Sequence, residues 1–103
     1  MQKRIHTLSA LVSAFLIACL PYPALAEISA GSVLASTCFT CHGTDGKSTG
    51  SIPSIYGIPA ETLVRNMKAF QSGERPSTVM ARHARGYTDE EIRIIANYLS
   101  EIE

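Results

Sequence analysis

The five residues Cys38-Phe39-Thr40-Cys41-His42 constrain this chain more than any other part of its sequence. Two thiols flank a two-residue gap, and an imidazole follows the second thiol directly. In this order the thiols can add across the two vinyl groups of a haem, while the histidine lies beneath the iron as an axial ligand. The motif therefore predicts one covalently attached c-type haem, with Cys38 and Cys41 as its attachment points and His42 as a metal ligand.

The length of the chain favours a fold built around such a cofactor. The 103 residues allow one domain at most. Removal of an N-terminal leader would leave residues 27–103 as the haem domain. A domain of this size lies close to the lower limit for a core made of side chains alone. A large apolar cofactor held by two covalent bonds would act as both core and cross-link.

Residues 1–26 have the pattern of a signal peptide. Lys3 and Arg4 precede an apolar run over residues 8–20, and Ala24-Leu25-Ala26 offers a small-residue cleavage site. The apolar run is shorter than the roughly 20 residues that a membrane-spanning helix needs. We therefore expect export to the periplasm and no membrane-spanning segment.

A second kind of processing stays open. Leu16-Ile17-Ala18-Cys19 resembles a bacterial lipobox, in which Cys19 would carry a lipid anchor and become the mature N-terminus. We favour cleavage after Ala26, because that site follows the apolar run at the usual distance. Either way, a disulfide between Cys38 and Cys41 is the chemical competitor of haem attachment in an oxidising compartment.

The charge balance gives no case for nucleic acid or an anionic membrane as partner. Without the leader, seven Lys and Arg stand against nine Asp and Glu. Arg75, Arg82 and Arg85 nevertheless gather in sequence around Met80. This grouping indicates either a positive rim that steers an acidic partner or a solvated turn.

Apolar periodicity predicts an all-α domain of three main helices and short turns. The first helix is expected over residues 28–38, with Ala30, Val33, Leu34 and Thr37 on one face. Residues 43–58 have the composition of a loop. The remaining helices are expected from Pro59 to Gly73, in a short turn over residues 78–84, and from the capping box at Thr88 to residue 102.

A second axial ligand has three candidates, Met67, Met80 and His83. Met67 lies on the apolar stripe of the second long helix and is expected to be core. Met80 lies between two helices, where no such stripe accounts for it. Met80 is therefore the predicted second metal ligand, and Met/His ligation raises the reduction potential of a haem.

Further residues are predicted around the haem. The Pro53 carbonyl would accept a hydrogen bond from the second ring nitrogen of His42 and so fix its tautomer. Ile55 and Tyr56, in the same loop, would help to cover a haem face. Tyr56, Tyr87 and Arg75 are weaker candidates for hydrogen bonds to the propionates.

Two other interpretations of the Cys-x-x-Cys spacing fit less well. A thioredoxin-like redox pair would follow a strand, whereas here a helix leads into the motif. A zinc site needs four ligands, and once the leader is removed only Cys38, Cys41, His42 and His83 could supply them. A non-haem module of either kind would be colourless.

Together these motifs resemble those of class I cytochromes c over residues 28–102. The resemblance implies that Gly31 meets an aromatic residue of the last helix, here Tyr98. Residues 70–88, with Ser77-Thr78-Val79-Met80 and Gly86-Tyr87, are more specifically similar to the cytochrome subunit of flavocytochrome c sulfide dehydrogenases. In that family the methionine is an axial ligand, a role that falls on Met80.

The resemblance implies a one-electron carrier with one haem c and no catalysis of its own. An FAD-containing sulfide dehydrogenase subunit would donate electrons, and another protein would accept them. A free-standing carrier for another periplasmic redox chain is the alternative. A haem sensor with a labile Met80 is a second alternative, which would bind CO in its reduced form.

Overall fold

The computed structural model describes residues 28–103, and these residues form helices, turns and loops with no strand. The proposed signal peptide and the lipobox at Cys19 lie outside the described residues. The helices in chain order are α2 (Ala30–His42), the short 3-10 helix η1 (Thr44–Gly46), α3 (Ala60–Ser72), α4 (Met80–Arg85) and α5 (Asp89–Ser100). The predicted all-α class, with three long helices, is confirmed.

Helix α2 continues four residues beyond its predicted end, so the whole Cys-x-x-Cys-His motif is helical. It begins after Ser29, whose side chain accepts a hydrogen bond from the Ser32 amide at 3.1 Å. It ends at Gly43, where a φ of 84° turns the chain away and the amide bonds to the Phe39 carbonyl at 3.1 Å. The helix therefore ends at Gly43 and not at Cys38, where the sequence predicts its end.

The face of α2 that packs on the protein differs from the predicted one. Gly31 and Ala35 are buried against α5, whereas Val33 and Thr37 are exposed. A Cβ atom added at Gly31 would lie 2.6 Å from the Tyr98 Cβ, so the two helices cross at backbone distance. Because small residues permit this approach, the interface carries little apolar periodicity. Of the predicted face, Leu34 packs against the core, whereas Ala30, Val33 and Thr37 are exposed, so the prediction was wrong for these three. The expected contact between Gly31 and Tyr98 is confirmed.

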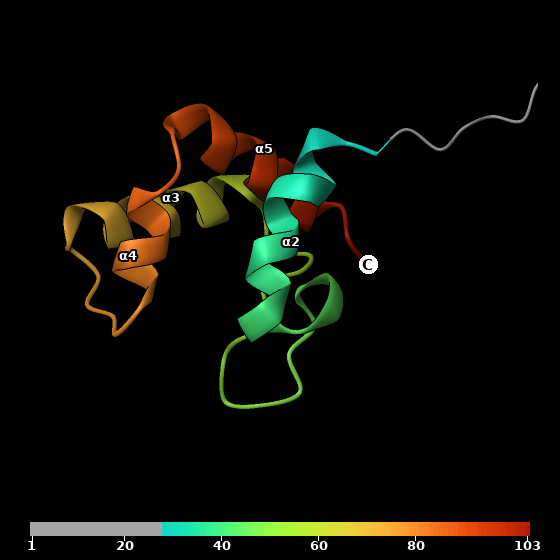
Figure 1. The fold of residues 1–103 in the computed structure, drawn as a ribbon, viewed down its shortest axis with the longest axis horizontal. Helices are drawn as coiled ribbons and strands as arrows, with labels where there is room; N and C mark the ends of the chain where they lie inside the picture. Colours follow the sequence, from blue (N-terminus) through green and yellow to red (C-terminus); the bar gives the residue numbers. More distant parts are fainter. Residues whose placement is uncertain (1–27) are drawn as a thin grey trace, which may run out of the picture.

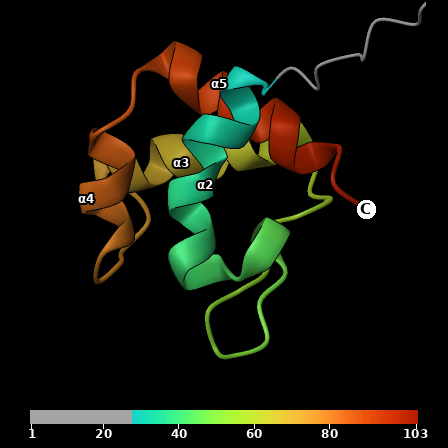
Figure 2. The same cartoon turned by 45° about the vertical axis from the view of Figure 1, so that its right-hand side comes forward.

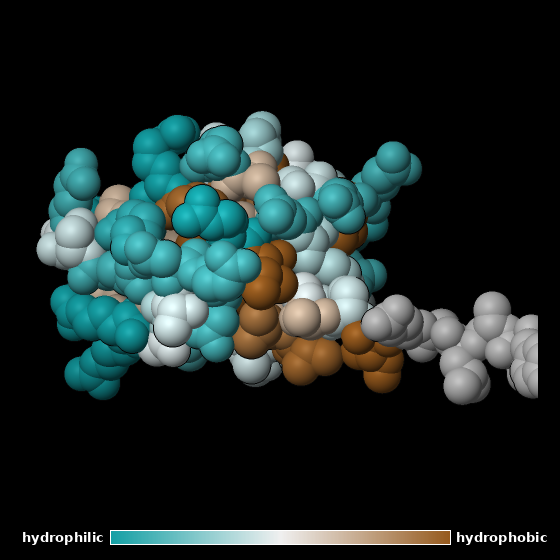
Figure 3. All heavy atoms as spheres, turned by 90° about the horizontal axis from the view of Figure 1, so that it is seen from above, coloured by the Kyte–Doolittle hydropathy of each residue, from teal (hydrophilic) through white to brown (hydrophobic). Residues whose placement is uncertain are grey.

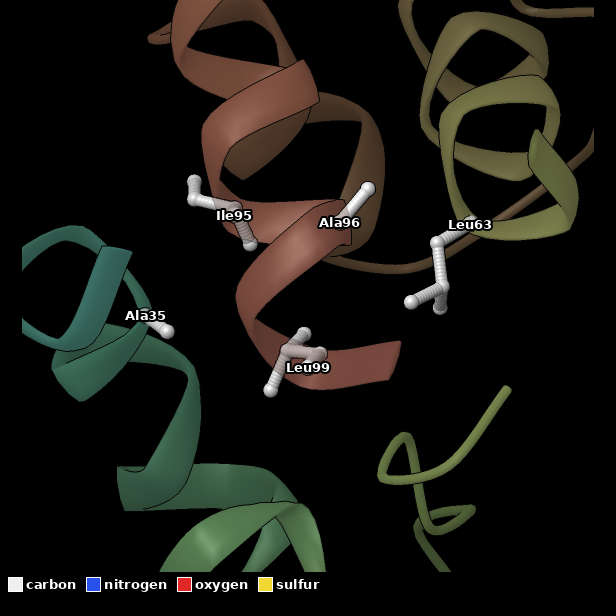
Figure 4. Close-up of a cluster of buried hydrophobic side chains, with 5 residues drawn as sticks. All are labelled: Ala35, Leu63, Ile95, Ala96 and Leu99. Carbon is white, nitrogen blue, oxygen red and sulfur yellow. The ribbon is translucent and has the colours of Figure 1, made fainter. Parts of the chain in front are cut away.

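One small core joins the three long helices (Figure 4). Ala35 of α2 and Leu63 of α3 face Leu99 and its neighbours on α5. The buried members of this cluster are Ala35, Leu63, Ile95, Ala96 and Leu99. Among the described residues the most deeply buried large side chains are Ile92, Leu99 and Ile95, which are 1%, 2% and 4% exposed. The side chains thus supply a modest core, as expected for a domain that also encloses a cofactor.

Helix α5 begins as predicted, at a capping box. The Glu91 amide bonds to the Thr88 hydroxyl at 3.2 Å, and the Glu91 carboxylate accepts from the Thr88 amide at 2.8 Å. Its predicted apolar stripe is buried from Ile92 to Leu99, and Ile102 is half-buried. This helix is the element on which α2 and α3 both pack.

Helix α4 lies at one end of the molecule, alongside α3 and away from α2 (Figures 1 and 2). Gly73, with a φ of 79°, ends α3, and an exposed turn leads back to α4. The Ser77 hydroxyl accepts a hydrogen bond from the Ala81 amide, in the first turn of α4, at 2.9 Å. Ala84 is the buried residue of α4.

The face seen in Figure 3 is mostly polar, and apolar side chains gather on one part of it. Ile28 and Val33 are among the exposed large apolar side chains. None of the helices formed by residues 28–103 has the length and apolar character needed to cross a membrane.

Candidate functional site

The last two turns of α2 present the predicted attachment residues. Cys38 and Cys41 stand three residues apart on this helix, a spacing that brings two side chains to the same face. Both are free thiols; Cys38 is half-buried and Cys41 is exposed. Burial raises the pKa of the Cys38 thiol, and a smaller hydrogen-bonding contribution from Thr37 lowers it. The two thiols are thus available side by side for bonds to one ligand.

His42, the last residue of α2, has a fixed ring orientation. Its Nδ1 lies 2.6 Å from the Pro53 carbonyl oxygen, and the residue is 9% exposed. A carbonyl can only accept, so Nδ1 carries the proton of this hydrogen bond. The neutral ring then keeps the lone pair on Nε2, the nitrogen that a metal can take. The predicted hydrogen bond between His42 and Pro53 is present.

The loop that carries Pro53 is held in place by contacts with η1. The Ile55 amide bonds to the Gly46 carbonyl at 2.8 Å, and a Cβ at Gly46 would lie 2.9 Å from Ile55 Cγ1. Ile55 also packs against the hydrophobic core. The Ser54 hydroxyl accepts from the Ser48 amide at 3.0 Å. The chain on both sides of Pro53 is therefore anchored, and its carbonyl stays directed at His42.

An open hollow of about 380 Å³ lies between the end of α2 and this loop. Cys41 and Ile52 line it, and its six other lining residues are hydroxyl-bearing or glycine, namely Thr40, Gly43, Ser48, Thr49, Gly50 and Ser51. The lining mixes polar and apolar surface and forms no enclosed apolar pocket of the kind that takes an apolar ring system. The hollow alone therefore does not define a haem site, which is better defined by the thiols and His42.

The three candidates for the second axial ligand occupy different environments. Met80 is the first residue of α4 and is half-buried, whereas His83, one turn on, is exposed. Met67 is half-buried within α3. Neither the Met80 nor the Met67 side chain belongs to the core cluster or to the apolar side chains packed against it, so the expected place of Met67 in the core is not found. The assignment of Met80 as second ligand stays a prediction.

The side chains suggested for the haem environment have partners of their own. Tyr56 is exposed, with the Lys47 ammonium 5.1 Å from its ring centroid. The Tyr87 hydroxyl shares a hydrogen bond of 2.7 Å with the Thr37 hydroxyl. The Arg75 guanidinium lies 4.8 Å from the Phe70 ring centroid. Contacts of Pro53, Ile55 and Tyr56 with a haem stay predictions.

Gln71, near the end of α3, escaped the sequence analysis. Its side-chain amide donates to the Ala84 carbonyl at 2.8 Å and to the Tyr87 carbonyl at 3.0 Å. It thereby binds the segment that follows Met80 to α3. A signal was present, because Gln71 stands four residues after Met67, where the apolar stripe of α3 calls for another apolar side chain.

The donor groups fit a covalently bound haem. Two neighbouring free thiols would hold the ring, and His42 offers an oriented nitrogen beside them. The small side-chain core is consistent with a domain completed by an apolar cofactor. Among residues 28–103 no three His, Cys, Asp or Glu side chains come together as a metal-binding group.

Comparison with known proteins agrees with this chemistry. The cytochrome c family model matches residues 28–103. The chain is 50% identical over 74 residues to the cytochrome subunit of sulfide dehydrogenase from Chlorobaculum tepidum. The matched region covers 72% of this chain and 67% of that protein.

Two further relatives carry electron-transfer names. Cytochrome c-554(548) of Halomonas halodenitrificans is 37% identical over 75% of this chain and 98% of its own length. The thiosulfate dehydrogenase electron acceptor of Stutzerimonas stutzeri is 32% identical over 63% of this chain and 32% of its own length.

Proposed function

Because this chain belongs to the cytochrome c family, in which one covalent haem c carries electrons, we propose that it is the monohaem cytochrome subunit of a sulfide dehydrogenase. The observation that supports this most strongly is the 50% identity with the cytochrome subunit of such an enzyme. An FAD-containing subunit would oxidise sulfide and deliver electrons to this chain. A separate protein would then accept them.

Four residues would hold the haem. Cys38 and Cys41 would form the thioether bonds to the haem, and His42 and Met80 would bind the iron. When bound, the haem supplies a one-electron couple between Fe(III) and Fe(II). The fixed tautomer of His42 and the half-buried position of Met80 support this assignment.

The other residues of the site would position these ligands and exclude water. Pro53 holds the His42 proton on Nδ1 and keeps the ring from turning. Ile55, packed on Gly46 and the core, keeps the Pro53 loop in place, and Tyr56 lies at its exposed edge. With His42 and Met80 both bound to the iron, no position would be open for a substrate. We therefore propose that this subunit transfers electrons and that the FAD subunit performs the chemistry on sulfide.

The same proposal places the mature chain in the periplasm. Residues 1–26 would be removed as a signal peptide, leaving a haem domain over residues 27–103. The bacterial cytochromes among the relatives support export in general terms. Mass spectrometry of the mature chain tests this step, because a lipid-modified N-terminus at Cys19 would replace an unmodified one at Glu27.

Optical spectra of the exported, haem-loaded protein test the ligand assignment. We expect a c-type reduced-minus-oxidised spectrum, together with the weak sulfur-to-iron band of the oxidised form. Met80→Ala should remove that band, and Met67→Ala should retain it. A haem spectrum without the band, combined with CO binding to the reduced protein, would instead favour a sensor.

Co-purification tests the partner. A tagged form of this chain should bring down a flavoprotein whose flavin is reduced by sulfide and reoxidised through this haem. If the chain purifies alone and no sulfide-reducible flavoprotein reduces it, it is a free-standing carrier for another redox chain.

A further inference from the structure

Helix α4, which begins with Met80, buries few of its side chains. It has six residues, of which Ala84 alone is buried, and the residue before it, Val79, is 53% exposed. It packs against α3, and in Figures 1 and 2 it stands apart from α2. Apolar burial alone therefore gives α4 a weak hold on its position.

Gln71 supplies a large part of the remaining attachment. Its Nε2 donates both of its hydrogens to this segment, one to Ala84 at the end of α4 and one to Tyr87 just beyond it. The backbone carbonyl of Gln71 in turn lies 3.5 Å from the Arg85 Nε. One residue of α3 thus contacts three residues of the segment that carries Met80.

A second contact fixes the same segment from the side of α2. The Tyr87 hydroxyl bonds to the hydroxyl of Thr37, the residue that precedes Cys38. The Tyr87 backbone is held by Gln71, and its side chain is held beside the helix that carries the thiols. Gln71 and Tyr87 together define the separation between Met80's segment and the attachment helix.

We propose that Gln71 is a positioning residue for Met80, and that its amide determines how firmly the thioether stays on the iron. This inference rests on the proposed role of Met80 as second ligand. Without the amide, the Ala84 and Tyr87 carbonyls lose a donor and α4 loses its main polar contact with α3. The segment then spends a larger fraction of time away from the haem, and an external ligand gains access to the sixth position in proportion to that fraction.

Imidazole binding to the oxidised, haem-loaded protein measures this fraction. Gln71→Met keeps the length of the side chain and removes both donors. Loss of the two hydrogen bonds from Gln71 should raise the apparent imidazole affinity roughly tenfold. We expect this increase together with a weaker sulfur-to-iron band.

Lys68→Met is the matched control. Lys68 lies on α3 one turn before Gln71, and its ammonium bonds to Asp89 of α5 rather than to α4. This variant also removes one polar contact between helices, but it should leave the imidazole affinity and the band unchanged. If Gln71→Met does not accumulate as a folded protein, Gln71→Asn replaces it. The shorter amide cannot reach both carbonyls, so the same direction of change is expected.

The possible results separate this inference from the proposed function. If Met80→Ala removes the band while the Gln71 variants bind imidazole as the wild type does, Met80 is the ligand and Gln71 does not position it. If Met80→Ala leaves the band intact, the ligand assignment fails and this inference fails with it. A tenfold effect shared equally by Lys68→Met would also overturn it, because general loosening of α3 would then be the cause.

Discussion

The two proposed axial ligands stand on regions that are held in place by different kinds of contact. His42 ends a long helix that crosses α5 at backbone distance, and its ring is fixed by the Pro53 carbonyl. Met80 begins a six-residue helix that rests on α3 through one buried alanine and a few hydrogen bonds. We call these the histidine side and the methionine side. Stability should depend mainly on the first, and access to the iron mainly on the second.

The largest expected effect is the loss of core on the histidine side. Leu99 is 2% exposed and belongs to the cluster that joins α2, α3 and α5. Leu99→Ala should lower the free energy of unfolding of the haem-loaded protein by about 2–5 kcal/mol, through lost transfer energy and a cavity. Denaturant titration measures it. Val79→Ala, on the exposed methionine side, should cost no more than about 0.5 kcal/mol.

A comparable cost for these two variants would remove the distinction between the sides. It would mean that the residues before Met80 are packed in the haem-loaded protein as tightly as the core of α5.

The second prediction concerns the crossing of α2 and α5. Gly31→Ala would set a Cβ 2.6 Å from the Tyr98 Cβ, an atom fixed to the α5 backbone that cannot turn away. The crossing must widen, so we expect a net destabilisation of about 1–2 kcal/mol despite the better helix propensity of alanine. Gly50→Ala is the control, because nothing lies within 4 Å of a Cβ there. If Gly31→Ala and Gly50→Ala have equal unfolding midpoints, α2 and α5 can move apart at little cost in stability.

This crossing also shows what could be predicted from the sequence. The predicted face of α2 rested on apolar periodicity and named Val33, which is 57% exposed. The true interface consists of Gly31 and Ala35, whose contribution is close approach rather than hydrophobicity. Family resemblance identified the contact between Gly31 and Tyr98, which periodicity could not.

For the site as well, the sequence revealed the features that depend on local patterns but not those that depend on distant contacts. The attachment motif and the capping box at Thr88 are local patterns, and both were found from the sequence. The amide of Gln71 bonds to carbonyls 13 and 16 residues away, so no local pattern reveals it. Its polar character on an apolar stripe could mark it as unusual, but its partners depend on how α4 folds back onto α3.

The third prediction addresses the charge of the methionine side. Arg82 and Arg85 are exposed, and the one ion pair among the described residues joins two other side chains, Lys68 and Asp89. Replacing both arginines with glutamate should slow electron transfer from the donor subunit roughly tenfold at low salt, because long-range steering is lost. The difference should shrink as salt is added. Stopped-flow reduction measures the rate.

Arg65→Glu and Arg93→Glu form the matched control, since these exposed arginines lie on α3 and α5 rather than on α4. The donor approaches the methionine side only if the first pair of substitutions slows the reaction more than the second. An unchanged rate at low salt for Arg82→Glu/Arg85→Glu would exclude a steering role.

The smallest predicted effect is the pH dependence of the ion pair between Lys68 and Asp89. The hydrogen bond from Lys68 and its charge hold the pKa of Asp89 below its ordinary value. A carboxylate with a lowered pKa adds stability above the pKa of the unfolded aspartate, about 4, and loses that contribution as the pH falls through the folded pKa. The unfolding midpoint of the wild type should therefore be slightly higher than that of Asp89→Asn at neutral pH. This difference in midpoint should disappear in acid.

Since both side chains are exposed, salt should narrow the same difference in midpoint. This pair joins α3 to α5 and leaves α4 untouched, so imidazole affinity should not change with it. If the difference in unfolding midpoint between wild type and Asp89→Asn persists below the folded pKa of Asp89, the ion pair is not its cause. The difference would then come from the place of Asp89 at the start of α5, directly after the Thr88 cap. A change in imidazole affinity on titration of Asp89 would instead mean that α5 also determines how firmly Met80 is held.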